Sequence, residues 1–277
     1  MCSEVTLLTL NNDNYFSQEA NKEYLSVSQY KSFTGTWATP MCEAKAKAEL
    51  EGKWTREKTT ALLVGSYVDS YFEGTLEQFK AENPSIFKRD GALKMDYIKA
   101  EEVIKRIERD NLFMQYLSGQ KQVIMTHDNL FGFGDKWKIK MDSYFPGKCI
   151  VDLKVMNNIR ERKYHREING YTTFVEEWGY DIQGAIYQEV VYRNTGERLP
   201  FFIACASKEK EPDIEVIWIP NEILEARLNE IKENIENVLI VKRGEAVPIR
   251  CGNCDYCRHT KVLKKPIHFT ELMGELD

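Results

Sequence analysis

The sequence has no apolar run that approaches the length of a membrane span, and a helix needs about 20 mostly apolar residues to cross a bilayer. The first residues also lack the basic segment and the apolar segment that mark a secretory signal. We therefore expect a cytoplasmic protein.

An excess of positive charge is also missing. The chain has 38 Lys and Arg residues against 43 Asp and Glu residues, which gives a formal net charge of −5. A general nucleic-acid coat is expected to be basic, so the composition argues mildly against one. It does not exclude a nuclease, because an acidic metal site adds negative charge that the bound ion offsets.

The composition itself is that of a globular protein. The 277 residues are 43% hydrophobic and 29% charged, which is enough for one large domain or for a domain with a small appendage. There are seven cysteines, and in a cytosolic chain of this size they indicate metal or redox chemistry rather than disulfides.

A predicted β-hairpin lies near the middle of the chain. Residues 137–145 and 149–156 are rich in β-branched and aromatic side chains and flank Pro146-Gly147. Side chains alternate along a strand, so Asp152 and Lys154 share one face while the residue between them points to the other.

Asp142, on the first of these strands, can face Asp152 and Lys154. Two carboxylates and an ammonium suit a divalent cation, because Mg²⁺ prefers one or two carboxylates plus waters and phosphate oxygens. Lys154 would then orient a water or stabilise developing charge. The alternative is an ordinary exposed Asp-x-Lys pair, which spacing alone does not exclude.

At these residues the chain resembles the PD-(D/E)XK nucleases, in particular their RecB and exonuclease VIII-like branch in phages and prophages. The resemblance implies an α/β, restriction-endonuclease-like fold with a central mixed β-sheet of about five strands flanked by α-helices. It implies a single nuclease domain over residues 1–277 with a core at about 26–257. It also implies a metal held by Asp142, Asp152 and the Leu153 carbonyl.

Gly65 and Asp69 lie four residues apart on a helix predicted over residues 55–72. The resemblance places them on the GxxxH helix of this branch, where the glycine permits close packing and the histidine approaches the metal. Asp69 stands where that histidine would be. A carboxylate binds Mg²⁺ or Mn²⁺ better than imidazole does, so Asp69 is a candidate third ligand. The alternative is a polar residue at the rim of the sheet.

Gln183 and Tyr187 are four residues apart on a helix predicted over residues 178–192. In the resembled family a QxxxY pair lies near the metal and the scissile phosphate, so both residues are candidate catalytic residues. An ordinary amphipathic helix is the competing interpretation.

Residues 157–171 form a basic stretch that also contains Tyr164 and His165. Its candidate DNA-binding residues are Arg160, Arg162, Lys163 and Arg166. Basic residues beside aromatic ones fit phosphate contact plus base stacking. A mobile charged loop is the alternative, because Glu161 and Glu167 dilute the positive charge.

Three cysteines near the C-terminus, Cys251, Cys254 and Cys257, are separated by two residues each, and such a loop lets sulfurs converge on a metal. A subset of RecB-like nucleases carries an iron–sulfur cluster held by one early cysteine and three late ones, which joins the two ends of the domain. Cys42 with the late three resembles that set and implies a [4Fe–4S] cluster. Zinc bound with Cys42 or His259, and unliganded thiols, are the alternatives.

The function implied by the resemblance is that of a Mg²⁺- or Mn²⁺-dependent DNA exonuclease of a phage or mobile element. It would resect linear duplex ends to feed a single-strand annealing recombinase, and a homo-oligomer is compatible with this role. A non-catalytic DNA-binding or recombination-accessory protein with the same fold is the main alternative. A small zinc-stabilised regulatory protein is a third.

Overall fold

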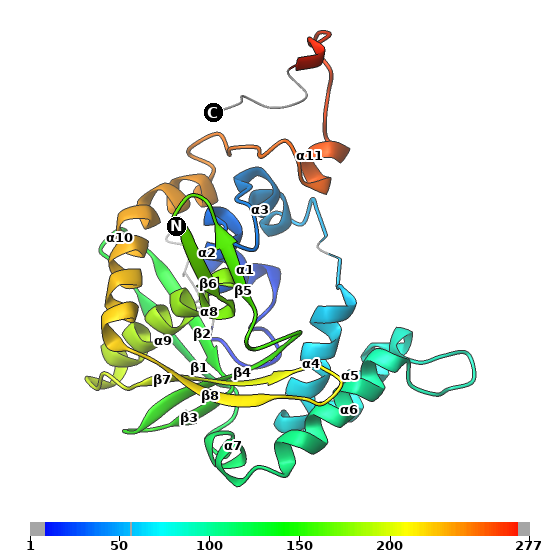
Figure 1. Ribbon diagram of the computed structural model, residues 1–277. Coiled ribbons are helices and arrows are strands. Elements are labelled where there is room, and N and C mark those ends of the chain that lie inside the picture. The colour runs from blue at the N-terminus through cyan, green and yellow to red at the C-terminus, as the bar shows by residue number, and fades with distance from the viewer. Residues whose placement is uncertain (1–8, 56, 271–277) are drawn as a thin grey trace, which may run out of the picture.

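The computed structural model describes residues 9–55 and 57–270 and shows an α/β fold (Figure 1). A four-stranded sheet has the order β3, β4, β7, β8. Its strands are β3 (Ser143–Phe145), β4 (Cys149–Met156), β7 (Phe201–Ser207) and β8 (Ile214–Ile219). The β3–β4 and β7–β8 pairs are antiparallel, whereas β4 and β7 are parallel. The predicted fold class, a central mixed sheet flanked by helices, is confirmed.

Two antiparallel pairs accompany this sheet. They are β1 (Val123–Asp128) with β2 (Lys136–Met141), and β5 (Arg162–His165) with β6 (Gly170–Thr173). The prediction of one strand over residues 137–145 is wrong, because β2 ends at Met141 and β3 begins at Ser143. Asp142 is therefore the joint at which the chain passes from one sheet to the other.

Helices cover both faces of the four-stranded sheet (Figure 1). The first layer consists of α9 (Tyr180–Thr195) and α10 (Asn221–Arg243), with α2 (Val27–Thr34) and α3 (Glu43–Leu50) packed against them. The second consists of α4 (Thr60–Glu73), α5 (Leu76–Glu82), α6 (Met95–Glu108) and α7 (Asn111–Tyr116). The short elements are α1 (Gln18–Glu23), η1 (Pro84–Ile86), α8 (Phe174–Glu177) and α11 (Asp255–His259).

Alternation along β4 divides the core between these layers. Ile150 packs into the cluster that contains α9 and α10, whereas Val151 and Leu153 pack into the cluster that contains α4 and α6. This is the period of two expected of a strand buried on both faces. Within the described part of the chain, no helix has the length and apolar character needed to span a membrane.

The structure moves two predicted helix starts and excludes the loop that was the alternative for the basic stretch. The helix predicted from residue 55 begins only at Thr60, because the Thr59 hydroxyl accepts a hydrogen bond from Leu62 N and caps the first turn. Helix α9 begins after Gly179, whose φ of 61° lies in the left-handed region. The basic stretch is not a loop, because most of it forms the hairpin β5–β6.

Two glycines of the helices differ in their surroundings. A Cβ at Gly184 of α9 would lie 2.7 Å from Phe201 Cδ1 and 2.9 Å from Leu224 Cδ2, so this glycine permits close packing against β7 and α10. At Gly65 of α4, no atom of the described residues lies within 4 Å of such a Cβ. The expectation that Gly65 permits close packing is therefore wrong.

We expect Gly184→Ala to lower the free energy of unfolding by about 1–3 kcal/mol, because overpacking a filled core costs more than the gain in helix propensity. Gly65→Ala is the matched control and should raise it by about 0.5–1 kcal/mol, since it meets open space. Equilibrium urea unfolding measures both. Equal stability of the two variants would show that the approach of α9 to β7 is not constrained at this point.

Candidate active site and cysteine cluster

Asp142 is fixed at the joint between β2 and β3. Its Oδ2 accepts a hydrogen bond from the backbone N–H of Leu153 at 2.9 Å, and its Oδ1 accepts a longer one, 3.4 Å, from Gln122 Nε2. The carboxylate thus lies against β4, next to the residues that the sequence analysis paired with it.

Asp152 is 2% exposed and lies between β4 and α9. Gln183 Nε2 of α9 donates a hydrogen bond to Asp152 Oδ1 at 2.6 Å. Asp152 Oδ2 forms an ion pair with Lys154 Nζ but accepts no well-aligned hydrogen bond from the described residues. One turn further along α9, the Tyr187 hydroxyl donates to the Lys140 carbonyl at 3.0 Å. The structure therefore brings Asp142, Asp152, Lys154 and Gln183 together, whereas Tyr187 contacts the backbone of β2.

Burial raises the pKa of Asp152 to about 6; the Lys154 ammonium opposes this shift and the Asp142 carboxylate adds to it. Burial alone would lower the pKa of Lys154, but Asp152 and Asp142 hold it above its ordinary value. Lys154 is consequently an ammonium at neutral pH, so it can donate hydrogen bonds and stabilise negative charge but cannot accept a proton.

Asp69 reaches the site from the opposite face of the sheet. It lines a small cleft together with Asp142 and Leu153. Burial, followed by the charge of Asp142, raises the pKa of Asp69 well above its ordinary value. Asp69 and Asp152 thus approach Asp142 from the two sides of β4.

The chemistry of these donors fits a hard divalent cation. Three carboxylates lie around β4, and burial together with the charge of Asp142 raises the pKa of Asp69 and Asp152, a situation that a bound cation relieves. They are less tightly gathered than the cysteines: within the described ranges, only the four cysteines form a group of three or more potential ligands whose atoms all lie within 4.8 Å. Waters and phosphate oxygens would complete such a coordination shell.

Two polar residues of the cleft that the sequence analysis missed are Glu73 and Gln122. Glu73 lies one helical turn after Asp69 on α4 and lines the same cleft, and this spacing could have revealed it. Gln122, which hydrogen-bonds Asp142, has a φ of 53°, an unusual value for a residue other than glycine. No pattern in the sequence indicates that conformation.

The four predicted DNA-binding residues have different surroundings. Arg160 forms ion pairs with Asp213 and Glu215, and Lys163 Nζ lies 3.5 Å from a carboxylate oxygen of Glu177. Arg162 and Arg166 form no ion pair with any residue that the structure describes. These last two arginines are therefore the more available for phosphate.

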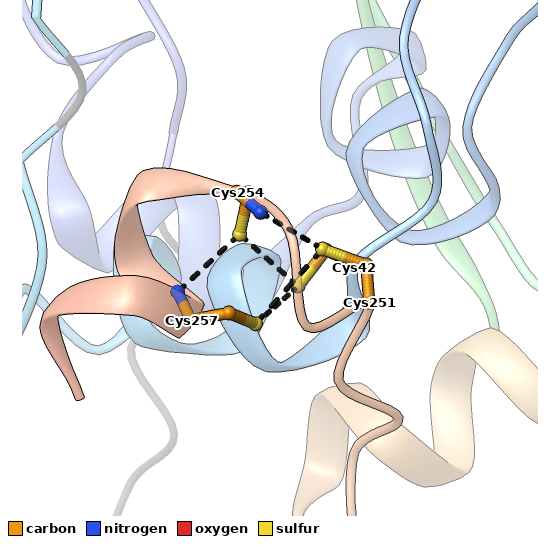
Figure 2. A group of neighbouring side chains, drawn as sticks. All are labelled: Cys42, Cys251, Cys254 and Cys257. Carbon is orange, nitrogen blue, oxygen red and sulfur yellow. Dashed lines mark hydrogen bonds between the residues drawn. The ribbon is translucent and has the colours of Figure 1, made fainter. Parts of the chain in front are cut away.

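The four predicted metal-binding cysteines lie together (Figure 2). Cys42 occupies the N-cap of α3, and the other three lie on the segment that ends in α11. Cys42 Sγ is 3.6 Å from Cys257 Sγ and 3.7 Å from Cys254 Sγ. Cys251 Sγ is 3.9 Å from Cys257 Sγ. His259 does not belong to the group.

The thiols of this cluster differ in acidity. Although burial opposes it, backbone N–H groups of Asn253 and Cys254 lower the pKa of Cys251 to about 6, so this sulfur is a thiolate at neutral pH, the form that binds metals. Tetrahedral coordination with Zn–S bonds of about 2.3 Å places sulfurs about 3.8 Å apart. In a [4Fe–4S] cluster each thiolate binds a different iron, so the sulfurs would need to lie further apart.

Comparison with known proteins agrees with this geometry. A family model described as a PDDEXK-like domain of unknown function (DUF3799) matches residues 26–260. A crystal structure described as that of a "Putative exonuclease" from Eubacterium rectale is 56% identical, with a TM-score of 0.94, and the match covers 97% of this chain and 100% of that one. A search of curated proteins finds no match. The resemblance inferred from Asp142, Asp152 and Lys154 is confirmed, and the chain belongs to this family of PDDEXK-like domains.

Proposed function

We propose that this protein is a Mg²⁺- or Mn²⁺-dependent deoxyribonuclease that degrades DNA from its ends. The convergence of Asp142, Asp152 and Lys154 at the joint between β2 and β3 is the observation that carries the proposal. The family and the similar crystal structure support a nuclease in general, and the description of that structure as an exonuclease supports action at ends.

Asp142, Asp152, the Leu153 carbonyl and Asp69 would hold the divalent cation. When bound, such an ion lowers the pKa of a water ligand and polarises the phosphodiester.

Lys154 stays protonated beside Asp152, so its role would be to orient the attacking water and to stabilise the negative charge that develops on the phosphate. Gln183 holds the Asp152 carboxylate through its amide. Tyr187 hydrogen-bonds the Lys140 carbonyl, two residues before Asp142, and is thus a positioning residue for that acid.

The biological role and the assembly rest on the sequence resemblance. We propose that the nuclease resects linear duplex ends for phage-type recombination and delivers the remaining strand to a single-strand annealing recombinase, with a homo-oligomer as a compatible assembly. The proposed domain is single, with a core at about residues 26–257.

We further propose that Cys42, Cys251, Cys254 and Cys257 hold a metal centre that joins the start and the end of this domain. Three of the Sγ pairs are 3.6–3.9 Å apart and all four sulfurs lie within 4.8 Å of one another, which supports a single tetrahedral ion such as zinc. A [4Fe–4S] cluster would need the four sulfurs to move apart.

Asp152→Asn and Lys154→Met should each lower the cleavage rate of linear duplex DNA at least about 100-fold, because each removes charge that acts at the reacting phosphate. Lys154→Met should retain more Mn²⁺ binding in calorimetry than Asp152→Asn does, since it keeps all the carboxylates. Lys136→Met, which removes a partly exposed ion pair with Glu23, is the control and should cleave like the parent protein. Parent-like cleavage by either site variant would refute the assignment.

The parent protein should degrade end-labelled linear duplex DNA in Mg²⁺ or Mn²⁺ and should leave covalently closed circles intact, because the proposed enzyme acts at ends. Removal of the divalent ion with EDTA should abolish degradation. Gel analysis of both substrates decides the outcome. Cutting of closed circles would indicate an endonuclease, and binding without cutting in either ion would indicate the accessory protein with the same fold.

Cys42→Ser should remove most of the bound metal and lower the midpoint of thermal unfolding, because it breaks the ligand set that joins α3 to the C-terminal segment. Cys149→Ser changes a cysteine outside the cluster and should retain the metal. Elemental analysis of protein purified without oxygen distinguishes zinc from iron. Equal, negligible metal in the parent and in both variants would contradict the proposal.

A further inference from the structure

The hairpin β5–β6 carries aromatic side chains on its outer face. Tyr164 and Tyr171 are opposite each other in the register, so both side chains lie on the same face. They are 51% and 68% exposed, and their ring centroids are 5.4 Å apart. Arg162 belongs to the same face, two residues before Tyr164. Exposed aromatic rings beside an arginine offer stacking and phosphate contacts on one surface.

This aromatic face is held in one conformation by the turn of the hairpin. The Tyr164 hydroxyl donates to Asn169 Oδ1 at 2.7 Å, and Asn169 N donates to the Arg166 carbonyl at 3.1 Å. Asn169 has a φ of 45°, a left-handed conformation that asparagine tolerates. Tyr164 is thus fixed, and it braces the ring of Tyr171. A pre-ordered ring loses less side-chain entropy when a ligand stacks on it.

The inner face of the hairpin is anchored on α8. Thr172 and Glu177 are buried, and the Glu177 carboxylate accepts hydrogen bonds from Thr172 and His165. Although burial opposes it, these bonds and the charge of Lys163 keep the pKa of Glu177 below its ordinary value. The Glu177 carboxylate therefore ties both strands of the hairpin to the body of the protein.

A series of contacts connects this anchor to the candidate active site. Lys163 Nζ lies 5.9 Å from the ring centroid of Trp178, whose carbonyl accepts a hydrogen bond from Lys31 Nζ at 2.8 Å. Lys31 Nζ and Lys154 Nζ lie 5.3 Å and 5.2 Å from the ring centroid of Tyr180. The hairpin therefore adjoins the side of the site on which Lys154 lies, and it stands off from the four-stranded sheet (Figure 1).

Charge complementarity identifies the class of ligand. The protein as a whole is acidic, yet Arg162 and Arg166 have no acidic partner among the described residues. Arginines beside exposed tyrosines match a polyanion that also offers flat rings, which is a nucleic-acid strand. Inside a duplex the faces of the bases are covered by their neighbours, so beyond the last pair of an end a tyrosine can stack only on unpaired bases.

We propose that the outer face of the hairpin binds a single DNA strand, with bases stacked on Tyr171 and Tyr164 and phosphates against Arg162 and Arg166. The hairpin would hold the unpaired strand of a DNA end beside the site at Asp142. The identification of DNA as the substrate is taken from the proposed function. We infer a single strand because the exposed rings of Tyr164 and Tyr171, which the hairpin turn holds in place, offer stacking surfaces for unpaired bases.

Fluorescence anisotropy in EDTA, where no cleavage occurs, tests the proposal with an oligothymidylate and a duplex of equal length. Tyr171→Ala should weaken single-strand binding at least about fivefold, as expected for the loss of one stacking contact, and should change duplex binding less than twofold. Tyr171→Phe should bind like the parent, because it keeps the ring. Arg162→Gln should reduce the salt dependence of single-strand binding by about one phosphate contact.

Trp218→Ala is the matched control, because Trp218 is an exposed aromatic residue on the edge strand β8, and it should bind both DNAs like the parent. Parent-like single-strand binding by Tyr171→Ala overturns the proposal, and so does an equal loss for duplex and single strand. The Asp152→Asn variant separates the two hypotheses: it should not cleave but should bind the single strand normally. If the parent cleaves no DNA but Tyr171→Ala still loses single-strand binding selectively, the nuclease proposal is refuted and the hairpin assignment stands.

Discussion

The hydrogen bond from Leu153 N–H to the Asp142 carboxylate organises this molecule. At this point the backbone of β4 is paired with a side chain, so the strand that began as β2 can leave its own sheet and continue as β3 in the other. The carboxylate remains at the joint. Because side chains alternate along β4, Asp152 and Lys154 then lie on the α9 face while Leu153 packs toward α4. One polar contact thus determines where the acids from both faces meet.

The polar groups around this joint are costly to bury. Asp152 is almost completely buried, and its attraction to Lys154 and its hydrogen bond from Gln183 offset its desolvation only in part, as its raised pKa shows. A buried ion pair of this kind is seldom more stable than apolar side chains of similar size. A gain in stability therefore does not explain why acids lie on both faces of β4. Binding of a cation and a phosphate would explain it.

The period of two in residues 149–156 was sufficient to place Asp152 and Lys154 on one face, whereas Gln183 became a candidate through the QxxxY pair of the resembled family. The break at Asp142 could not be predicted, because the residues on both sides of it have equally high β-propensity and the interruption arises from a tertiary hydrogen bond. The hairpin β5–β6 was missed because its charged residues weaken the strand signal, and because the hydrogen bonds that anchor it on Glu177 of the following helix α8 are not visible in the sequence. The grouping of Cys42 with the late cysteines came from the family resemblance, since no local pattern relates segments so far apart.

The cysteine cluster and the candidate active site are separate in space, but they are connected through α3, α2 and β2. Cys42 begins α3, which packs against α2, and Leu25, just before α2, exchanges backbone hydrogen bonds with Lys136 and Lys138 of β2. Strand β2 is therefore held by β1 on one edge and by Leu25 on the other, and it ends at Met141, directly before Asp142. The metal proposed at the four cysteines would fix α3 and so stabilise this arrangement from outside. Its loss should consequently loosen the support of Asp142 without removing any group that reacts.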